Sequence, residues 1–275
     1  MKKIIEYIRL SEWIHLVGIS LISSLLFAPS LSWNIVRKII MLIFFAAIIF
    51  LSIFLMNRYY DSIILREKAR SLDKNLALIF FFLGTFGCFI FINLQVFLIS
   101  IVGFFICLIY IHPKFILKNN PMAAAILYLL GGILICFASG SLFALNIKSL
   151  LLGIYFGFLL IGGNLIHEIR DYDEDKKSGF KTCPIRIGKK KTYFLSFIFF
   201  TISHLYILFL GLIKYIPLFL SILLFSGYLF YSFFYLKTYK KGINSRNILK
   251  FQKQYRLIYA LIGVLSFVLL LTFKL

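Results

Sequence analysis

Long apolar runs separated by short polar segments form the dominant pattern of this sequence. Each run is close to the ~20 residues that an α-helix needs to cross the hydrocarbon core of a membrane. Asn93 and Gln95 mark a turn between the third run and the fourth, which are both short. The pattern predicts nine transmembrane helices, at about residues 13–32, 35–56, 76–93, 95–112, 122–145, 147–166, 192–212, 215–236 and 256–273.

The composition agrees with this interpretation. Of the 275 residues, 61% are hydrophobic and only 15% are charged, and the mean hydropathy is +0.96. A soluble domain carries about 25% charged residues. We therefore expect an all-α polytopic membrane protein, a nine-helix transmembrane bundle that forms one domain over residues 1–275. Residues 1–12 mix isoleucine with lysine and arginine, which predicts an interfacial entry helix.

The charged residues predict the orientation of the helices. With a cytoplasmic N-terminus, the cytoplasmic segments hold 25 of the 30 Lys and Arg residues and all ten acidic residues. Because basic residues favour the cytoplasmic side, we expect a multi-pass protein of the cell (inner) membrane with its chemistry facing the cytoplasm. The net charge of +20 could suggest nucleic acid, but cationic loops facing anionic lipid explain it, so no nucleic-acid partner is expected. The cytoplasmic segments are 1–12, 57–75, 113–121, 167–191 and 237–256.

Residues 164–188 lie at the end of the sixth apolar run and contain five of the ten acidic residues. A helix continued through it projects four polar side chains from one face, at i, i+4, i+7 and i+11. Aligned carboxylates repel one another unless a cation lies between them, and Mg²⁺ is usually held by one or two carboxylates plus phosphate oxygens. The alternative is a solvated interfacial loop of mixed charge. The four side chains are those of Asn164, Glu168, Asp171 and Asp175, and the basic residues that suit a diphosphate are Arg170, Lys176, Lys177, Lys181 and Arg186.

A second polar helix end begins at residue 57. Asn57 precedes Asp61 by one helical turn, as Asn164 precedes Glu168. This similarity indicates a weak internal duplication in which each half supplies a metal-binding helix end. Two such ends facing a central cavity would hold a diphosphate between them. Alternatively, Asn57 and Asp61 are simply a polar helix end.

The loop between these two motifs contains Tyr110, Pro113, Lys118 and Pro121. Tyr110 and Lys118 could donate hydrogen bonds to a phosphate oxygen. Equally, the two prolines could bound an interhelical turn, with Tyr110 in an aromatic belt.

Metal sites built from cysteine or histidine are not expected. No Cys-x-x-Cys pair occurs, and His15, His112 and His204 have no ligand partners at metal spacing. His167 differs because it lies beside the acidic stretch. It could accept a proton, or it could pack as a neutral side chain.

Together these motifs resemble the UbiA superfamily of intramembrane prenyltransferases. The family pattern has nine helices, two Asp-rich loops and a Tyr-x-x-Pro…Leu-Lys-x-x-Pro element between them. Asn57-x-x-x-Asp61 resembles the start of the first motif. The second motif is matched by Arg170-Asp171-x-x-x-Asp175-x-x-x-Gly179-x-x-Thr182, and the middle element by Tyr110, Pro113, Leu117, Lys118 and Pro121. The resemblance covers about residues 5–270.

The resemblance implies a Mg²⁺-dependent membrane prenyltransferase. Such an enzyme transfers a prenyl group from a polyprenyl diphosphate to an aromatic or other lipophilic acceptor, in quinone or isoprenoid-lipid biosynthesis. It implies Mg²⁺ binding by Asn57, Asp61, Glu168, Asp171 and Asp175. It implies catalytic roles for Asp61, Asp171, Asp175 and Lys118, and substrate binding by Arg58, Tyr110, Lys118, Arg170 and Lys181.

The first motif departs from the family pattern. Leu65 stands where relatives usually have a further Asp, and Arg58 stands at a position that is often acidic. Glu67 and Asp73 lie nearby but out of helical phase. This departure leaves open a weakened enzyme or a non-enzymatic transporter or lipid-binding protein of similar fold, although a transporter would favour charges near the bilayer midplane. Neither the acceptor nor the prenyl chain length is specified by these residues.

Overall fold

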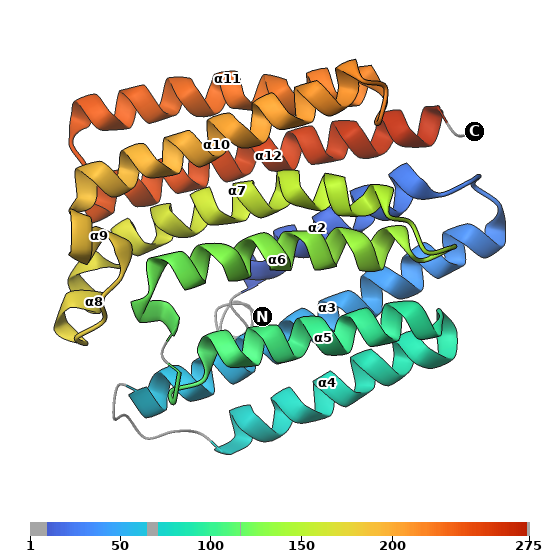
Figure 1. Ribbon diagram of the computed structural model, residues 1–275, viewed down its shortest axis with the longest axis horizontal. Helices are drawn as coiled ribbons and strands as arrows, with labels where there is room; N and C mark the ends of the chain where they lie inside the picture. Colours follow the sequence, from blue (N-terminus) through green and yellow to red (C-terminus); the bar gives the residue numbers. More distant parts are fainter. Residues whose placement is uncertain (1–9, 65–70, 116, 274–275) are drawn as a thin grey trace. The chain divides into compact units, whose positions relative to one another are not determined.

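The computed structural model describes residues 10–64, 71–115 and 117–273, with the side chains of residues 10–12 and 118 left out. Within these ranges the chain is helical and contains no strand (Figure 1). The helices are α2 (Leu10–Phe27), α3 (Trp33–Ile64), α4 (Ser71–Phe91), α5 (Leu94–Ile111), the short 3₁₀ helix η1 (Leu117–Asn119), α6 (Pro121–Gly140), α7 (Lys148–Arg170), α8 (Tyr172–Lys177), α9 (Cys183–Ile187), α10 (Lys189–Leu212), α11 (Leu218–Lys241) and α12 (Ser245–Thr272).

The predicted all-α membrane fold is confirmed. Eight of the described helices are long and apolar enough to cross a membrane, and Trp13–Phe27 is a shorter apolar helix. Each of the nine predicted runs corresponds to one of these helices. The first run was predicted to reach residue 32, but α2 ends at Phe27. Pro29 explains the early end, because it restricts the preceding Ala28 and cannot donate a backbone hydrogen bond. Most of the predicted interfacial helix at residues 1–12 lies outside the described residues.

Asn93 separates α4 from α5, as the sequence predicts. Its side-chain oxygen accepts a hydrogen bond from the Val96 amide at 2.8 Å and so caps the start of α5. Its side-chain nitrogen donates to the carbonyls of Ser141 and Leu142, both at 3.1 Å. The two short runs are therefore separate helices.

The helices extend beyond their apolar runs at the ends that carry polar residues. α3 continues to Ile64, although its apolar run ends near residue 56. α12 begins at Ser245, although its run was predicted to begin near residue 256. The α3 extension carries Asn57, Arg58 and Asp61, and the α12 extension carries Gln252.

The contacts divide the chain into two compact units, so the prediction of a single domain stays a prediction. Unit 1 comprises Met1–Leu117, Ile133–Gly153 and Leu271–Leu275, and unit 2 comprises Lys118–Gly132 and Ile154–Leu270.

In unit 1, α3 packs closely on α4. A Cβ atom at Gly87 would lie 2.1 Å from the ring of Phe45, so only glycine allows this approach. Nearer the polar end, the Ser52 hydroxyl donates to the Ala77 carbonyl at 2.7 Å. Leu55, Met56, Ala77 and Ile111 form a buried cluster beside it. This cluster fixes the last turns of α3, where the first polar motif begins.

In unit 2, the polar ends of four helices are held by an aromatic core. Tyr193 of α10 stacks on Tyr235 of α11 with ring centroids 4.2 Å apart, and its hydroxyl donates to the Tyr235 carbonyl at 3.1 Å. Stacked aromatic pairs add to the stabilisation that burial provides. The same core includes Ile166 and Ile169 of α7 and Ile248, Phe251 and Tyr255 of α12. It therefore places the end of α7 against the start of α12.

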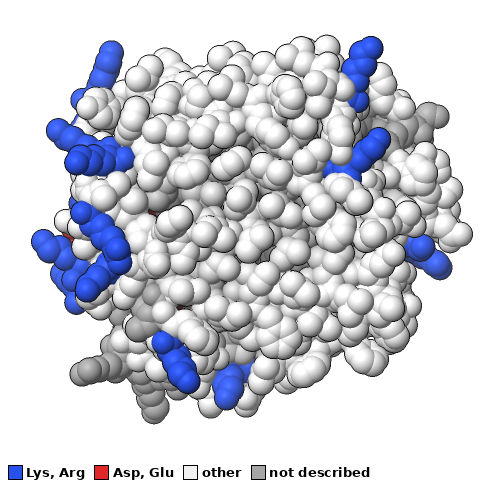
Figure 2. All heavy atoms as spheres, viewed as in Figure 1, with Lys and Arg blue, Asp and Glu red and all other residues white. Residues whose placement is uncertain are grey.

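The surface is that of a multi-pass membrane protein. Large apolar side chains such as Phe82, which is 63% exposed, point outward along the helices. A soluble protein rarely exposes apolar surface on this scale. Figure 2 shows a broad uncharged surface with lysine and arginine side chains mostly toward the edges of the view. In unit 2 the lysines of the first turn of α10 and the last turn of α11 lie at the same end as α8 and α9.

Candidate active site

The first polar motif lies on the last two turns of α3 in unit 1. The Asn57 side-chain nitrogen donates to Oδ2 of Asp61 at 3.0 Å. Both side chains are half-buried. The hydrogen bond orients the Asp61 carboxylate and shows that the Asn-to-acid spacing noted in the sequence is a direct contact. Leu65 and Glu67 lie outside the described residues.

Arg58 is paired with Asp73, a residue to which the sequence analysis gave no role. Arg58 Nε is 2.9 Å from Asp73 Oδ2, and its Nη2 is 2.7 Å from Oδ1. Asp73 lies in the first turn of α4, and its side chain is 3% exposed. In this structure Arg58 therefore neutralises a buried carboxylate, and its predicted contact with a diphosphate stays a prediction.

The middle element is described only in part. Tyr110 packs beside the Leu55–Met56 cluster at the end of α5, and the side chain of Lys118 is outside the described residues. Asn119 connects this element to the basic loop of the second motif. Its side-chain oxygen accepts from the Lys181 amide at 2.8 Å, and its carbonyl accepts from Arg186 Nη2 at 2.5 Å. The Lys181 side chain is exposed, and its predicted contact with the substrate stays a prediction.

The second motif does not form the single helical stripe that the spacing predicted. α7 ends at Arg170, Asp171 has φ −91° and ψ 7°, and α8 begins at Tyr172. The Asp171 carbonyl accepts from the amides of Glu174 and Asp175, which starts the new helix. A continuous helix would have placed these carboxylates at a negative helix end. The break gives them a helix N-terminus, where negative charge is favoured.

Glu168 is held by two hydrogen bonds. Oε1 accepts from the Asn164 side chain at 2.7 Å, and Oε2 accepts from the backbone amide of Cys183 at 2.9 Å. The first bond repeats the Asn57–Asp61 arrangement in the other unit. The second fastens α9 to α7. Each carboxylate oxygen keeps a further lone pair, so the predicted metal contact of Glu168 stays a prediction beside this structural role.

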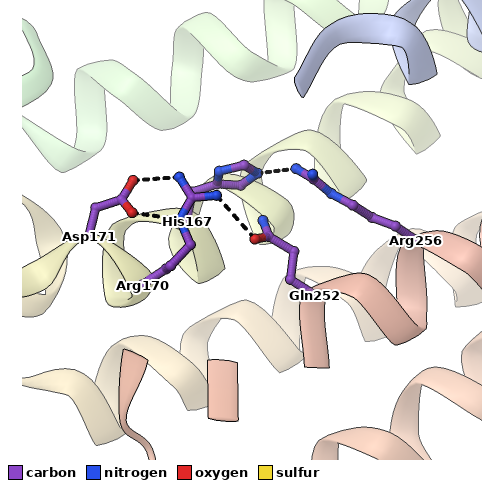
Figure 3. A network of polar contacts seen from close by, with 5 residues as sticks. All are labelled: His167, Arg170, Asp171, Gln252 and Arg256. Atoms are coloured by element: carbon purple, nitrogen blue, oxygen red, sulfur yellow. Dashed lines mark hydrogen bonds and ion pairs between the residues drawn. The ribbon is translucent and has the colours of Figure 1, made fainter. Parts of the chain in front are cut away.

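Arg170 and His167 connect the second motif to α12 (Figure 3). Arg170 Nε and Nη2 contact the two oxygens of Asp171 at 2.5 and 2.7 Å, and Nη1 donates to Oε1 of Gln252 at 3.2 Å. Arg256 Nη2 donates to His167 Nε2 at 2.5 Å. A guanidinium group can only donate, so this ring nitrogen of His167 carries no proton. His167 Nε2 is therefore the acceptor in this contact, and a role of His167 in accepting a proton stays a prediction.

The acidic residues suit a magnesium ion that arrives with a phosphate ligand. Among the residues that the structure describes, no group of three or more His, Cys, Asp or Glu side chains could hold a metal ion by itself. Asp61, Asp171 and Asp175 nevertheless offer hard oxygen donors that are partly exposed. Mg²⁺ bound to a substrate phosphate needs only one or two protein carboxylates, so the donor set fits this mode. The two acidic helix ends belong to different units, and their meeting across a cavity stays a prediction.

Comparison with known proteins identifies the family. The model of the UbiA prenyltransferase family matches residues 13–253, a range that includes both polar motifs. The chain belongs to the UbiA prenyltransferase family. A comparison with curated protein sequences finds no match.

Solved structures share this UbiA fold. A UbiA homologue from Archaeoglobus fulgidus bound to DMAPP and Mg²⁺ has a TM-score of 0.70 and 17% identity, over 97% of this chain and 99% of that one. A UbiA homologue from the same organism bound to GPP and Mg²⁺ gives 0.69 and 18%, with the same coverage. A structure from work on digeranylgeranylglyceryl phosphate synthase in membranes also gives 0.69 and 18%, over 99% of this chain and 100% of that one. At these identities the likeness shows the UbiA fold.

The sequence patterns did not predict that α12 contacts the second motif. They placed Gln252 and Arg256 in the cytoplasmic segment 237–256. A signal was present in the sequence. Ile248, Phe251 and Tyr255 follow helical spacing and are all buried. That spacing predicts a helix that starts before residue 256. Such a helix places Gln252 and Arg256 one turn apart on the same face.

Proposed function

We propose that this UbiA-family protein transfers a prenyl group from a polyprenyl diphosphate to an aromatic or other lipophilic acceptor, with Mg²⁺ bound at the diphosphate. One observation carries the proposal. The segment that matches the second acidic motif folds as a polar helix end, with partly exposed carboxylates of Asp171 and Asp175 beside basic side chains. A Mg²⁺–diphosphate group requires this combination of hard oxygen donors and cations.

The proposed role of each site residue follows from the charge or polarity of its side chain. Asn57, Asp61, Asp171 and Asp175, with Glu168 as a further candidate, would hold the metal. When bound, Mg²⁺ would supply Lewis-acid stabilisation of the diphosphate as its bond to the prenyl carbon breaks. Preorganised charge of this kind is usually the largest single contribution to catalysis. The side chains assigned to the growing negative charge are those of Arg58, Tyr110, Lys118, Arg170 and Lys181.

The proposal extends to the donor and acceptor classes. The A. fulgidus homologues were solved with DMAPP and with GPP, which supports a prenyl diphosphate donor for this chain. We propose an acceptor used in quinone or isoprenoid-lipid biosynthesis, such as a hydroxybenzoate, a dihydroxynaphthoate or a glycerol phosphate. The likeness to the structure from work on digeranylgeranylglyceryl phosphate synthase supports testing a glycerol phosphate as the acceptor.

The site is proposed to face the cytoplasm from the cell (inner) membrane. In unit 2 the ends of α7 and α11 and the starts of α10 and α12 carry basic residues. This is the distribution expected of cytoplasmic helix ends. Protease or thiol-labelling accessibility in sealed vesicles would test the orientation.

Purified protein in detergent with labelled geranylgeranyl diphosphate and Mg²⁺ tests the function. Asp171→Ala and Asp175→Ala are each expected to lower transfer on the order of a hundredfold or more. Asp173→Ala is the matched control, because Asp173 is 69% exposed and lies 3.7 Å from Lys189 in a surface pair of little energetic weight. Unchanged transfer in both site variants would show that the assigned site is wrong.

The acceptor is identified by a separate measurement. Mass spectrometry of lipid extracts from cells with and without the protein should show one prenylated product that depends on the protein and is lost with Asp171→Ala. Binding of the donor without any product, in vitro and in cells, would favour the non-enzymatic alternative.

A further inference from the structure

Arg170 lies between an acidic partner on its own chain segment and an amide on α12. Its guanidinium contacts both oxygens of Asp171, at 2.5 and 2.7 Å, and also donates to Gln252 Oε1 at 3.2 Å (Figure 3). The Arg170 and Asp171 side chains are partly exposed, whereas Gln252 is 1% exposed. Arg170 therefore contacts a partner in a solvent-accessible position, Asp171, and another that is fixed in the core of unit 2, Gln252.

A metal ion at Asp171 would compete with Arg170. Both are cations, and the two-point contact of the guanidinium occupies the carboxylate edge that a metal would approach. Each Asp171 oxygen keeps a second lone pair, but a metal ion bound there would lie close to the guanidinium cation. Repulsion between the two cations therefore favours a carboxylate that turns at least one oxygen away from Arg170. The guanidinium then needs another acceptor, since an arginine cannot lose its proton. Gln252 Oε1 already supplies one, without adding a charge.

We propose that Gln252 is a positioning residue that holds Arg170 on α12, so that Asp171 can exchange the guanidinium for a Mg²⁺–diphosphate ligand. The inference rests on the proposed function. Arg170 would neutralise Asp171 before the substrate arrives and would stay within reach of the diphosphate afterwards.

The second contact between α7 and α12 supports this role. Arg256 follows Gln252 by one helical turn, and His167 precedes Arg170 by one turn, so the two hydrogen bonds lie side by side. The aromatic and aliphatic core beneath them joins the same two helices. The Gln252 amide therefore sits on a fixed helix face and keeps its position when Asp171 turns.

Binding of Mn²⁺ in the presence of inorganic pyrophosphate, followed by electron paramagnetic resonance, tests the proposal without turnover. Gln252→Leu removes this acceptor and so favours the contact of Arg170 with Asp171. Mn²⁺ binding should therefore weaken roughly fivefold, the effect of one hydrogen bond. Gln252→Glu holds Arg170 more strongly, so Mn²⁺ binding should strengthen. A purely structural role of Gln252 would weaken binding in both variants.

Gln254 supplies matched controls. It lies two residues away on a different face of α12, so Gln254→Leu and Gln254→Glu repeat the changes in polarity and charge without touching Arg170. Both should bind Mn²⁺ as the unmodified protein does. In an Arg170→Gln background, Gln252→Leu should have no further effect, because its action passes through Arg170.

The outcomes separate this inference from the proposed function. If Asp171→Asn abolishes Mn²⁺–pyrophosphate binding while both Gln252 variants bind normally, the role of Gln252 is wrong and the proposed site stands. If the unmodified protein does not bind Mn²⁺ with pyrophosphate, both are wrong. If Gln252→Leu unfolds on purification, the Gln252→Glu variant tests the role of Gln252 alone. Stronger Mn²⁺ binding by Gln252→Glu is expected only if Arg170 is exchanged for the metal at Asp171, and unchanged or weaker binding would contradict that role.

Discussion

Arg58 of α3 and Asp73 of α4 form a two-point ion pair, with Nε 2.9 Å from Oδ2 and Nη2 2.7 Å from Oδ1. The carboxylate of Asp73 is almost completely buried, and a buried charge is costly unless a cation compensates it. The pair therefore fastens the end of α3, which carries Asn57 and Asp61, to the start of α4.

Removing Arg58 should destabilise unit 1. Arg58→Leu removes the guanidinium that pairs with the buried Asp73 carboxylate and is expected to lower the free energy of unfolding by about 3 kcal/mol. Thermal denaturation in detergent measures the change. Arg58→Leu with Asp73→Leu should recover most of the stability, because no buried charge remains. If Arg58 also binds the diphosphate, the double variant should recover stability but not transferase activity.

Glu168 can be tested for its two roles separately. Glu168→Gln keeps an oxygen for the Cys183 amide, and Asn164 can turn its own amide to match, so the melting temperature should change little. Glu168→Ala loses both hydrogen bonds and should cost about 1–3 kcal/mol of stability. If Glu168 binds Mg²⁺, the Gln variant should need several-fold more Mg²⁺ for half-maximal transfer. An unchanged Mg²⁺ requirement in a stable Gln variant would limit Glu168 to its structural role.

Gly157 of α7 lies close to the backbone of α6 within unit 2. A Cβ atom there would lie 2.8 Å from the Leu129 carbonyl oxygen and 2.9 Å from the Leu129 Cα. Since backbone atoms cannot turn aside as a side chain can, Gly157→Ala should lower the free energy of unfolding by about 1–3 kcal/mol. Gly131→Ala is the control, because nothing lies within 4 Å of its added Cβ. Equal melting temperatures of the two variants would contradict this packing.

Cys183 should react slowly with thiol reagents. It is 3% exposed in α9, and burial raises the pKa of its thiol above the ordinary value. The thiolate is the reactive form, so at pH 8 the folded protein should be labelled by a maleimide on the order of tenfold more slowly than an unfolded chain. A variant with Cys88, Cys107 and Cys136 replaced by alanine isolates the signal.

The sign of the Cys183 shift also gives a pH dependence. The raised pKa means that the folded state retains its thiol proton at pH values where the unfolded chain begins to lose it. The contribution of Cys183 to stability is therefore present below the ordinary thiol pKa and declines as pH rises above it. If a maleimide labelled Cys183 in the folded protein as fast as in the unfolded chain, the thiol would be accessible and its predicted protection would be wrong.

The fold class could be predicted because a membrane-spanning helix leaves a strong local signal. Its length is set by the bilayer, and its backbone hydrogen bonds lie within the segment, so each apolar run indicates one helix. The ends of the helices were less predictable. α3 and α12 continue into polar sequence, where hydropathy no longer distinguishes a helix from a loop.

The sequence by itself determined the membrane class, the approximate spans and the position of the two acidic motifs, because these depend on local composition and spacing. Only the tertiary structure decided which polar side chains contact one another. It paired Arg58 with Asp73 and joined Arg170 to both Asp171 and Gln252, across 82 positions for the last pair. It also broke the expected stripe at Asp171 and gave Glu168 the Cys183 amide as a partner. A side chain takes the partner that packing places within about 3 Å, and spacing along one helix cannot specify a neighbour on another.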